Sequence, residues 1–441
     1  MTTAAVKNEM ETTEAGNYFV SNYPPYSFWT PDKVPEAQLA LERPPKPGNP
    51  LGIYLHIPFC RKRCHFCYFK VYTGVNSNQI RTYIDAAKKE LEIYRHMPFI
   101  GGRKPSFIYF GGGTPSFLST AQLQTVTDAL NAALPWDQAE EITFECEPGT
   151  LNERKLQFIR QLGVTRLSLG VENFNARILE INGRAHRSAE IDRAYQWARA
   201  TGFPQINIDL IAGMLEETDE NWRSCIDKVL AMEPDSVTIY QMEIPYNTTI
   251  YKQMKVDGKI VAPVADWPTK RRWVTEAFAA LENAGYSVTS AYTAVKDPNT
   301  TRFVYRDQLW RGADLMSLGV ASFSHVNGTH YQNETDMDDY LARLEKDELP
   351  IFRALTPTTE ELLIRELILQ FKLGHVNVHY FADKFGVDIK QRFATPLNEL
   401  RRLEVLAEEN GELVLSRPGL LQVDRLLHQF FLPAHQTDRM T

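Results

Sequence analysis

The residues most suited to chemistry are three cysteines in one short loop. Cys60, Cys64 and Cys67 have the spacing C-x3-C-x2-C, and the chain holds 5 cysteines in all. This odd number makes a poor disulfide framework, whereas thiolates are the ligands that zinc and iron–sulfur clusters select. Structural zinc needs a closed set of four ligands, which His56 or His65 would have to complete. Three thiolates alone suit a four-iron cluster with one iron left open for chemistry, and we predict this cluster.

The charge beside the cysteines is positive. Arg61, Lys62 and Arg63 stand between the first two cysteines, and nearby positive charge lowers the pKa of a thiol. We expect this triplet to favour the thiolate form. An ordinary solvated basic face is the alternative interpretation of the same three residues.

A glycine-rich turn follows a later apolar segment. Gly111, Gly112 and Gly113 precede Thr114 and Pro115, and glycines let the backbone and its amides approach a ligand closely. The turn is neither a P-loop nor a dinucleotide-binding fingerprint, since it lacks both of those spacings. It indicates a ligand contact only in combination with the other motifs.

Acidic side chains stand at or near the ends of successive apolar segments. These are Glu145, Glu172 and Asp209. Carboxylates in such positions suit hydrogen bonds from ribose hydroxyls or from an amino group. The alternative is that they form buried ion pairs inside a barrel, with Arg166 and Arg184 as partners.

These motifs need a scaffold that brings segment ends together. Short apolar runs alternate with longer amphipathic ones, which predicts β–α units around a parallel sheet. Such folds bind their ligands at the carboxyl ends of the strands. We expect strands at 53–57, 106–110, 142–145, 166–170, 206–211 and 236–241, and helices near 78–97, 120–133, 152–162, 188–201 and 218–231. We expect a further helix at 268–284, a strand at 286–290 and a loop from 303 to about 333.

The two ends of the chain differ from this pattern. Residues 17–50 are rich in proline and aromatic residues and are interpreted as an arm and linker. Beyond residue 358, helical patterns precede a hairpin pattern that turns at Asn410-Gly411. This order predicts a winged-helix-like module, and without a basic stripe its role is structural or substrate-covering rather than DNA reading. Its helices are expected at 360–371, 378–385 and 389–403, and its hairpin at 405–416.

The overall composition excludes several classes of protein. The 441 residues are 43% hydrophobic and 23% charged, as in ordinary globular proteins. The net charge of −7, from 48 Lys and Arg against 55 Asp and Glu, makes general nucleic-acid binding a poor fit. No apolar run reaches the roughly 18–20 residues of a membrane span, and no secretory signal is visible. We therefore expect a cytoplasmic protein.

Four motifs together resemble the radical S-adenosylmethionine (SAM) enzymes. They are Tyr54–Cys60, Gly111–Pro115, Arg166–Val171 and Asn207–Ile211. The closer resemblance is to the group that contains oxygen-independent coproporphyrinogen III oxidases, heme chaperones and class C radical methyltransferases. It implies an α/β fold: a partial (β/α)6 radical-SAM-type barrel with a C-terminal, mainly helical, winged-helix-like module. Any one motif alone would carry little weight, whereas their combination is specific.

The resemblance also implies roles for individual residues. Cys60, Cys64 and Cys67 would hold a [4Fe–4S] cluster whose open iron binds S-adenosyl-L-methionine, in one or two molecules per chain. An electron from the cluster would cleave the sulfonium and yield a 5′-deoxyadenosyl radical that abstracts hydrogen from the substrate. Tyr23 and His325 are candidates for a catalytic role, although none is assigned. The implied cofactor-binding residues are Tyr54, Phe66, Gly112, Gly113, Thr114, Glu145, Glu172, Arg184, Asp209 and Glu243.

Some positions separate the members of this group. Phe69 stands where the oxidases usually show a further cysteine, and Glu172 stands where the group commonly has glutamine. The stretch 305–310 lacks the His-Asn pair of the chaperones' heme-binding motif, whereas the arm at Tyr18–Trp29 resembles the arm of the oxidases. We predict a coproporphyrinogen III oxidase-like enzyme that decarboxylates porphyrinogen propionates in heme biosynthesis. The alternatives are a radical methyltransferase or cyclopropanase, and a heme chaperone.

These predictions imply an organisation and a set of partners. We expect a disordered tail at 1–16, the arm and linker at 17–50, a barrel domain at 51–345 and a C-terminal domain at 346–441. The expected partners are a tetrapyrrole or similar small substrate and an electron donor such as flavodoxin or ferredoxin. We expect a monomer without nucleic-acid partner or membrane span. Candidate cations for propionate binding are Arg61, Arg63, Arg184 and Arg302.

Overall fold

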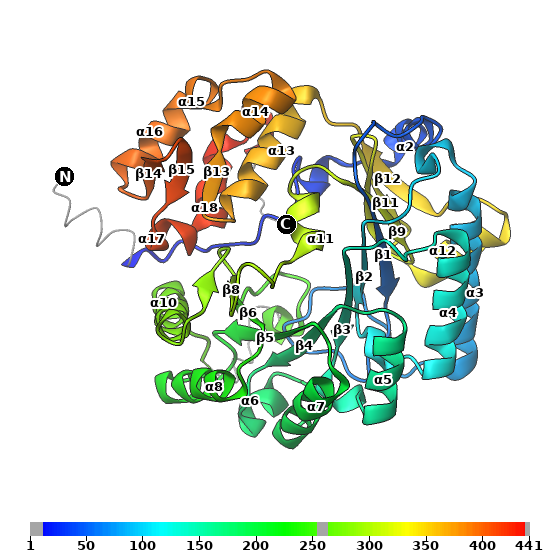
Figure 1. Ribbon diagram of the computed structural model, residues 1–441, viewed down its shortest axis with the longest axis horizontal. Helices are drawn as coiled ribbons and strands as arrows, with labels where there is room; N and C mark the ends of the chain where they lie inside the picture. Colours follow the sequence, from blue (N-terminus) through cyan, green and yellow to red (C-terminus); the bar gives the residue numbers. More distant parts are fainter. Residues whose placement is uncertain (1–11, 254–262, 437–441) are drawn as a thin grey trace.

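The centre of the molecule is a set of six parallel strands that stand side by side in chain order (Figure 1). The computed structural model describes residues 12–253 and 263–436. A helix separates each strand from the next, as parallel pairing requires. The predicted α/β fold with a partial (β/α)6 barrel is confirmed. The strands are β1 (Leu51–Ile57), β2 (Phe107–Gly112), β3 (Glu141–Cys146), β4 (Arg166–Glu172), β5 (Gln205–Ala212) and β6 (Ser236–Gln241).

The helices that connect these strands lie along the outside of the sheet (Figure 1). Two of them begin with a capping box, formed by Asn76 with Gln79 and by Ser119 with Gln122. Each box satisfies backbone N–H groups that the first helical turn leaves free, so these helices start where the sequence indicates. The helices are α3 (Ser77–Arg95), α4 (Thr120–Ala133), α5 (Glu153–Gln161), α6 (Ala176–Ile181), α7 (Ser188–Thr201), α8 (Asp219–Met232), α9 (Thr249–Tyr251) and α10 (Trp267–Asn283).

The sheet continues beyond the parallel strands at both edges. β9 pairs with β1 in parallel, and β10, β11 and β12 follow in antiparallel order, while β8 and β7 extend the edge at β6. The prediction of a loop from 303 to 333 was therefore wrong. The strands there are short and separated by glycines, so no run is long enough to show a periodicity. The elements are β7 (Ser287–Val288), β8 (Thr293–Val295), α11 (Val304–Leu309), β9 (Asp314–Leu318), β10 (Phe323–Val326), β11 (Thr329–Asn333), α12 (Met337–Glu345) and β12 (Ile351–Leu355).

The C-terminal elements form a separate group beside α10 and β8 (Figure 1). The hairpin turns at Asn410-Gly411 as predicted, and β13 adds a third strand to it. The single helix expected at 389–403 is broken at Phe393, after which Pro396 occupies the first turn of a new helix, where its missing N–H costs nothing. The elements are α13 (Thr359–Phe371), β13 (His375–Asn377), α14 (Val378–Phe385), α15 (Ile389–Arg392), α16 (Ala394–Arg402), β14 (Leu406–Glu409), β15 (Glu412–Leu415), α17 (Arg417–Leu420) and α18 (Val423–Leu427).

The arm ties the C-terminal elements to the barrel. Val20 and Tyr23 belong to the hydrophobic core of the C-terminal elements, which is distinct from the core of the barrel. The buried ammonium of Lys372 lies 2.7 Å from Asp424, and both bind the backbone of Val20. Later in the arm, α2 (Val34–Leu41) packs against β11 and β12. Burial of these groups on both sides fixes the course of the arm across the molecule.

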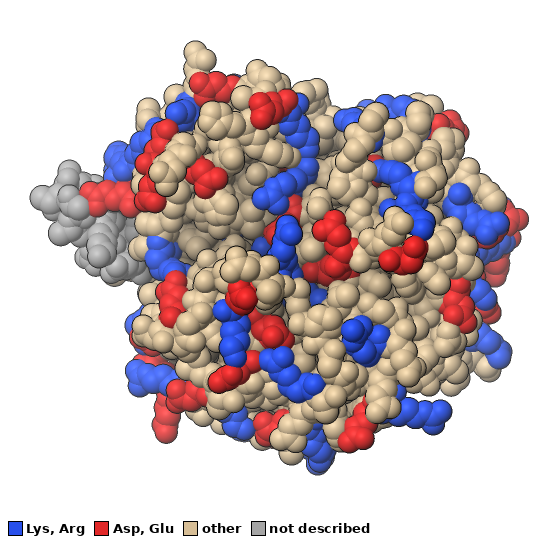
Figure 2. Space-filling model, viewed as in Figure 1, with Lys and Arg blue, Asp and Glu red and all other residues tan. Residues whose placement is uncertain are grey.

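The remaining predictions concern surface charge, membrane spans, the N-terminal tail and the domain boundaries. Figure 2 shows Lys and Arg interspersed with Asp and Glu on this face, without a broad field of one sign, as the low net charge leads one to expect. Among the described residues, no helix is long and apolar enough to cross a membrane. Most of the tail expected at 1–16 lies outside the described residues. The domain boundaries at 51–345 and 346–441 stay a prediction.

Candidate functional site

The cysteine loop follows the carboxyl end of β1 and is contacted by two distant segments. The hydroxyl of Thr114 lies 3.3 Å from the sulfur of Cys60, and the guanidinium of Arg184 lies 3.3 Å from that of Cys64. Within the loop, the amide of Cys67 donates to the carbonyl of Cys64 at 3.2 Å. The structure thus brings together the three cysteines, the glycine-rich turn and the segment after β4, as the sequence predicts.

The glycine-rich turn lies against the cysteine loop because it has no side chains. A Cβ on Gly113 would stand 3.0 Å from the sulfur of Cys60 and 2.9 Å from the carbonyl oxygen of Ile57. A Cβ on Gly112 would lie 2.6 Å from the ring of His56, and its φ of 111° is itself unfavourable for other residues. Both positions therefore require glycine for close approach rather than for flexibility.

A charged pair holds the cysteine loop to the end of β3. Arg61 donates two hydrogen bonds to Glu147, at 2.8 and 2.9 Å, and His186 approaches the same carboxylate at 3.2 Å. Burial alone would raise the pKa of Glu147, but the bonds from His186 and Arg61 lower it to about 2. The carboxylate therefore stays ionised and fixes one side of the loop.

The basic triplet favours thiolates only in part, because the charge of Arg63 lowers the pKa of Cys67 but burial has the larger effect. Burial raises the pKa of Cys60 to about 11 and that of Cys67 to about 12. Arg61 is paired with Glu147, and Arg63 donates to the carbonyl of Cys67, so neither cation is directed at a sulfur. Burial outweighs the charges of Arg184 and Arg63, so the pKa of each thiol is raised, and a metal is the partner that deprotonates such ligands.

The donor set fits an iron–sulfur cluster better than a single ion. None of the cysteines is in a disulfide, and the described residues contain no group of three or more His, Cys, Asp or Glu side chains that could hold one metal ion. In a cluster each thiolate binds a different iron, so the sulfurs stand farther apart than the ligands of one ion. The buried Nε2 of His56 and Nε of Arg184 also lack a partner. The site is therefore open to a further group.

The three carboxylates named from the sequence are all partly buried inside the barrel. Glu145 accepts from the hydroxyl of Tyr109 at 2.6 Å and from the amide of Gly112 at 3.2 Å, and Glu172 lies 3.6 Å from the guanidinium of Arg184. Asp209, in the middle of β5, accepts from a serine and an asparagine. The ion-pair interpretation therefore holds for Glu172 with Arg184, whereas binding of ribose or an amino group by these carboxylates stays a prediction.

Burial shifts the protonation of this group. It raises the pKa of Glu145 and Glu172 to about 7, and it raises that of Asp209 above its ordinary value. Buried carboxylates of this kind are stabilised in their charged form by a nearby cation. Glu172 also has a φ of 65°, in the left-handed region that few side chains adopt, at an irregularity in the pairing of β4 with β5. The interior is thus prepared for a positively charged ligand.

Two aromatic residues named from the sequence lie on either side of the loop. Tyr54 points into the barrel, where its hydroxyl lies 3.2 Å from His56 and its ring stacks on Tyr109 at 5.8 Å. Phe66 lies in the loop itself and packs on a small apolar cluster that includes Met242. Their roles toward a cofactor remain predictions.

Three further candidates are engaged elsewhere. Glu243 accepts from the amide of Phe19 at 2.7 Å, so it anchors the arm. The hydroxyl of Tyr23 lies 2.7 Å from His435, in the C-terminal core. His325, on β10, lies 2.9 Å from the second histidine of its hairpin and is fully enclosed. These contacts are structural, and catalytic roles for Tyr23 and His325 stay predictions.

Sequence reasoning missed two parts of the site. Tyr109 faces inward two residues before Gly111, and strand alternation could have indicated its contact with Glu145. The pairing of Glu147 with Arg61 had no local signal, because 86 positions separate the two residues. Of the candidate propionate ligands, Arg61 and Arg184 are ion-paired. Arg302 lines a cavity whose lining does not include the cysteine loop.

Comparison with known proteins identifies the scaffold. The model of the radical SAM superfamily matches residues 54–229, which include the cysteine loop and β1 to β5. Residues 54–229 belong to the radical SAM superfamily. The radical SAM region is followed by a match to the HemN C-terminal domain at residues 357–421, which covers α13 to α17. The cofactors of this radical SAM protein are a [4Fe–4S] cluster and S-adenosyl-L-methionine, as predicted.

Similar proteins extend the match along the chain. The oxygen-independent coproporphyrinogen III oxidase of Escherichia coli is 26% identical over 395 residues, covering 85% of this chain and 84% of that protein. The heme chaperone HemW of Bacillus subtilis is 25% identical, over 83% of this chain and 96% of that one. The solved structure of the E. coli oxidase superposes with a TM-score of 0.80 at 22% identity, over 93% of this radical SAM chain and 96% of that chain.

Proposed function

We propose that this radical SAM protein is a coproporphyrinogen III oxidase-like enzyme. The contact that carries the proposal is Arg184, which lies 3.3 Å from the sulfur of Cys64 and 3.6 Å from Glu172. It joins the cluster loop to the buried carboxylates, so a cationic cofactor on the open iron would lie beside them. Relatives with the oxidase name along most of the chain support the substrate class.

The chain's own residues bind and orient the reactants. When bound, the cluster and S-adenosyl-L-methionine supply one-electron cleavage of the sulfonium and abstraction of a hydrogen atom. Cys60, Cys64 and Cys67 would hold the cluster. Gly112, Gly113 and Thr114 would hold the methionine end of the cofactor, and Glu145 would accept from ribose hydroxyls. Burial of these groups excludes water from the reacting atoms.

The proposed reaction balances when one external acceptor takes up an electron. Each propionate side chain would lose one hydrogen atom and carbon dioxide and become a vinyl group. One electron would remain and pass to an acceptor, which this chain does not itself provide. We infer that a separate electron carrier also reduces the cluster.

The heme chaperones are the main competing assignment, because HemW aligns over 96% of its own length. The segment that would correspond to their heme motif is α11 with Trp310. Tyr305 packs on Tyr109 with 4.4 Å between ring centroids, and its amide donates to Glu141. This segment closes the barrel interior and has no histidine to bind heme iron, which favours the enzyme.

Anaerobic reconstitution tests the proposal. The purified chain, loaded with iron and sulfide, is incubated with coproporphyrinogen III, S-adenosyl-L-methionine and a reductant, and the products are analysed by mass spectrometry. We expect loss of carbon dioxide together with 5′-deoxyadenosine. Formation of S-adenosylhomocysteine with a methylated product would instead assign a methyltransferase.

Two variants separate cluster chemistry from general damage. Cys64→Ala should abolish cluster assembly and cofactor cleavage, because it removes one of three ligands. Cys225→Ala is the matched control, since Cys225 is buried in α8 and contacts Asn173 rather than the loop. Cofactor cleavage by Cys64→Ala would contradict the assigned ligand set. A heme-bound spectrum with axial ligation in the wild-type protein would favour the chaperone.

A further inference from the structure

A cationic cavity lies at the amino ends of the strands, away from the cysteine loop. Its volume is about 160 Å³. Arg166 and Ser236, which line it, are the first residues of β4 and β6. The opposite end of β4, at Glu172, lies about 20 Å away at the usual rise per residue of a strand. The cavity therefore lies at the opposite end of β4 from Glu172, while the charge of Arg166 still counteracts the rise in the pKa of Glu145 and Asp209 inside the barrel.

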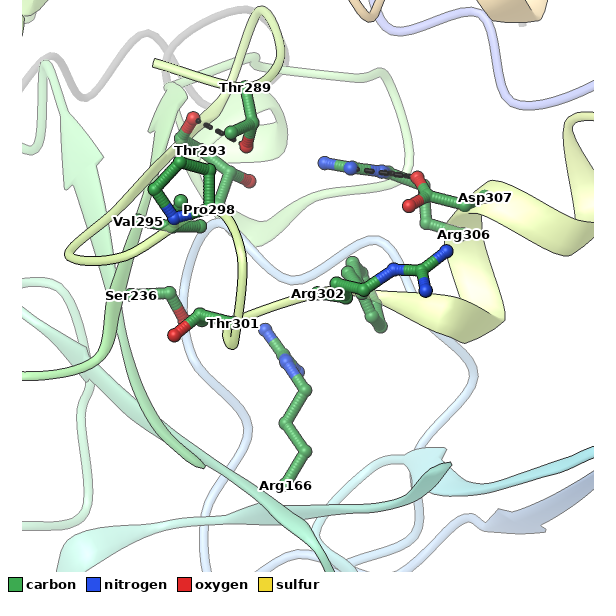
Figure 3. A pocket seen from close by; sticks show the side chains of 11 residues that line it. Arg166, Ser236, Thr289, Thr293, Val295, Pro298, Thr301, Arg302, Arg306 and Asp307 are labelled. Carbon is green, nitrogen blue, oxygen red and sulfur yellow. Dashed lines mark hydrogen bonds and ion pairs between the residues drawn. The ribbon is translucent and has the colours of Figure 1, made fainter. Parts of the chain in front are cut away.

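The lining is rich in arginine and hydroxyl groups. Figure 3 shows Arg166 rising from the sheet toward Thr301, and Arg306 directed toward Asp307. Arg302 belongs to the same lining and is exposed to solvent on the segment that covers the cavity. Three arginines against one aspartate give this small space an excess of positive charge.

Arg166 is buried without a hydrogen-bonding partner. It is 2% exposed, and among the described residues it makes neither a hydrogen bond nor an ion pair within contact distance. Its guanidinium instead lies 4.1 Å from the centre of the Phe303 ring. A guanidinium has five N–H donors, and those of Arg166 are available to a ligand in the cavity that it lines.

Two carboxylates beside the covering segment already have other partners. Glu141 accepts from the amides of Val304 and Tyr305, at 2.9 and 3.1 Å, and from the hydroxyl of Thr143. These bonds hold the covering segment to β3 and occupy both carboxylate oxygens. Asp307 pairs with Arg306 at 2.8 Å. Neither acid is therefore hydrogen-bonded to Arg166.

Arg302 and Arg306 leave further donors available. Arg302 makes no hydrogen bond or ion pair with any residue in the described ranges. Arg306 has a buried Nη1 without a partner, although its other nitrogens bind Asp307. A guanidinium fork matches the geometry of carboxylate and phosphate oxygens, and three arginines line this cavity.

We propose that this cavity binds a small oxyanion, a phosphate or a carboxylate, at a site distinct from the radical chemistry. At about 30 Å³ per water, the space corresponds to about five waters, which is room for such an ion. The anion accepts from Arg166 at the floor and from Arg302 at the mouth. By binding the covering segment to the sheet, it stabilises the folded barrel.

Calorimetry on the full-length protein tests the site. Inorganic phosphate and succinate are titrated separately, at an ionic strength held constant with chloride, into the wild-type chain and into Arg302→Ala. We expect saturable binding of at least one of these anions and a loss of affinity of about tenfold in Arg302→Ala, because a charged hydrogen bond is removed. The anion that binds identifies the class as phosphate or carboxylate.

Further variants keep the result interpretable. Arg166→Met should lose more anion affinity than Arg302→Ala does. If Arg166→Met does not fold, Arg302→Ala still tests the site, because Arg302 is exposed. Arg81→Ala, on the exposed face of α3, is the control for loss of one positive charge and should bind as the wild type does. Absence of saturable binding by either anion, or equal affinity in Arg302→Ala and wild type, would overturn the proposal. Iron content, measured in parallel, reports on the radical site independently.

Discussion

Arg61, in the cysteine loop, forms a two-bond pair with Glu147, which directly follows β3. The pair joins a loop that is rich in metal ligands to the rigid parallel sheet. His186 contacts the same carboxylate from beyond α6. Three segments that are distant in sequence are thereby fixed around one acidic side chain, and the position of the cysteines depends on it.

Replacing this acid should destabilise the loop. Glu147→Gln removes the charge that binds Arg61 and His186, and we expect a loss of about 1–3 kcal/mol in the free energy of unfolding. We also expect the reconstituted variant to release iron faster, because the loop is less constrained. Urea denaturation and iron release to a chelator measure these effects. Glu153→Gln, at an exposed position of α5, should leave both unchanged.

The same pair predicts a dependence on pH. The pKa of Glu147 is about 2 in the folded protein, below the ordinary value of 4.5. The folded state therefore binds the proton less well than the unfolded state, so the contribution to stability is complete above about pH 4.5. It is lost as the pH falls from there toward 2. The difference in unfolding free energy between wild type and Glu147→Gln should thus be large at pH 7 and shrink below pH 4, and a constant difference would contradict the assignment.

A methyl group at the glycine-rich turn should disturb the cysteine loop. In Gly113→Ala the new Cβ meets the carbonyl oxygen of Ile57 and the sulfur of Cys60, neither of which is at the end of a flexible side chain. We expect less iron per chain after reconstitution, measured by iron and sulfide analysis. Gly74→Ala strains the backbone at a φ of 71° but meets no atom within 4 Å, so it should retain its iron. Equal iron content in both variants would show that the turn can move away.

The buried pair of Lys372 with Asp424 should control the attachment of the arm. Lys372→Met leaves the Asp424 carboxylate buried without its cation, which typically costs about 3–5 kcal/mol. Combining it with Asp424→Asn removes the unpaired charge and should restore a large part of the stability. A double-mutant cycle by chemical denaturation, with limited proteolysis near Val20, measures the coupling. Additive effects in the cycle would mean that the two residues do not act together.

Local patterns were enough to predict most of the barrel. Apart from α6, which was not predicted, the strands and helices from β1 to α8 lie within a few residues of their predicted positions, because apolar periodicity and capping residues such as Asn76 and Ser119 act over short distances. The prediction of a loop from 303 to 333 was wrong because the strands there do not depend on a local pattern. These strands exist through pairing with β1 and with one another, and tertiary pairing leaves no mark in so short a run.

The sequence by itself determined the ligand chemistry: three thiols at fixed spacing, a turn that only glycine can make, and carboxylates at strand ends. The tertiary structure alone decided which partner each charge received. It paired Arg61 with Glu147 and Arg184 with Glu172, and it left Arg166 beside an aromatic ring. Spacing fixes which groups a loop can present, whereas electrostatic pairing depends on distances between segments that meet only when the sheet has formed.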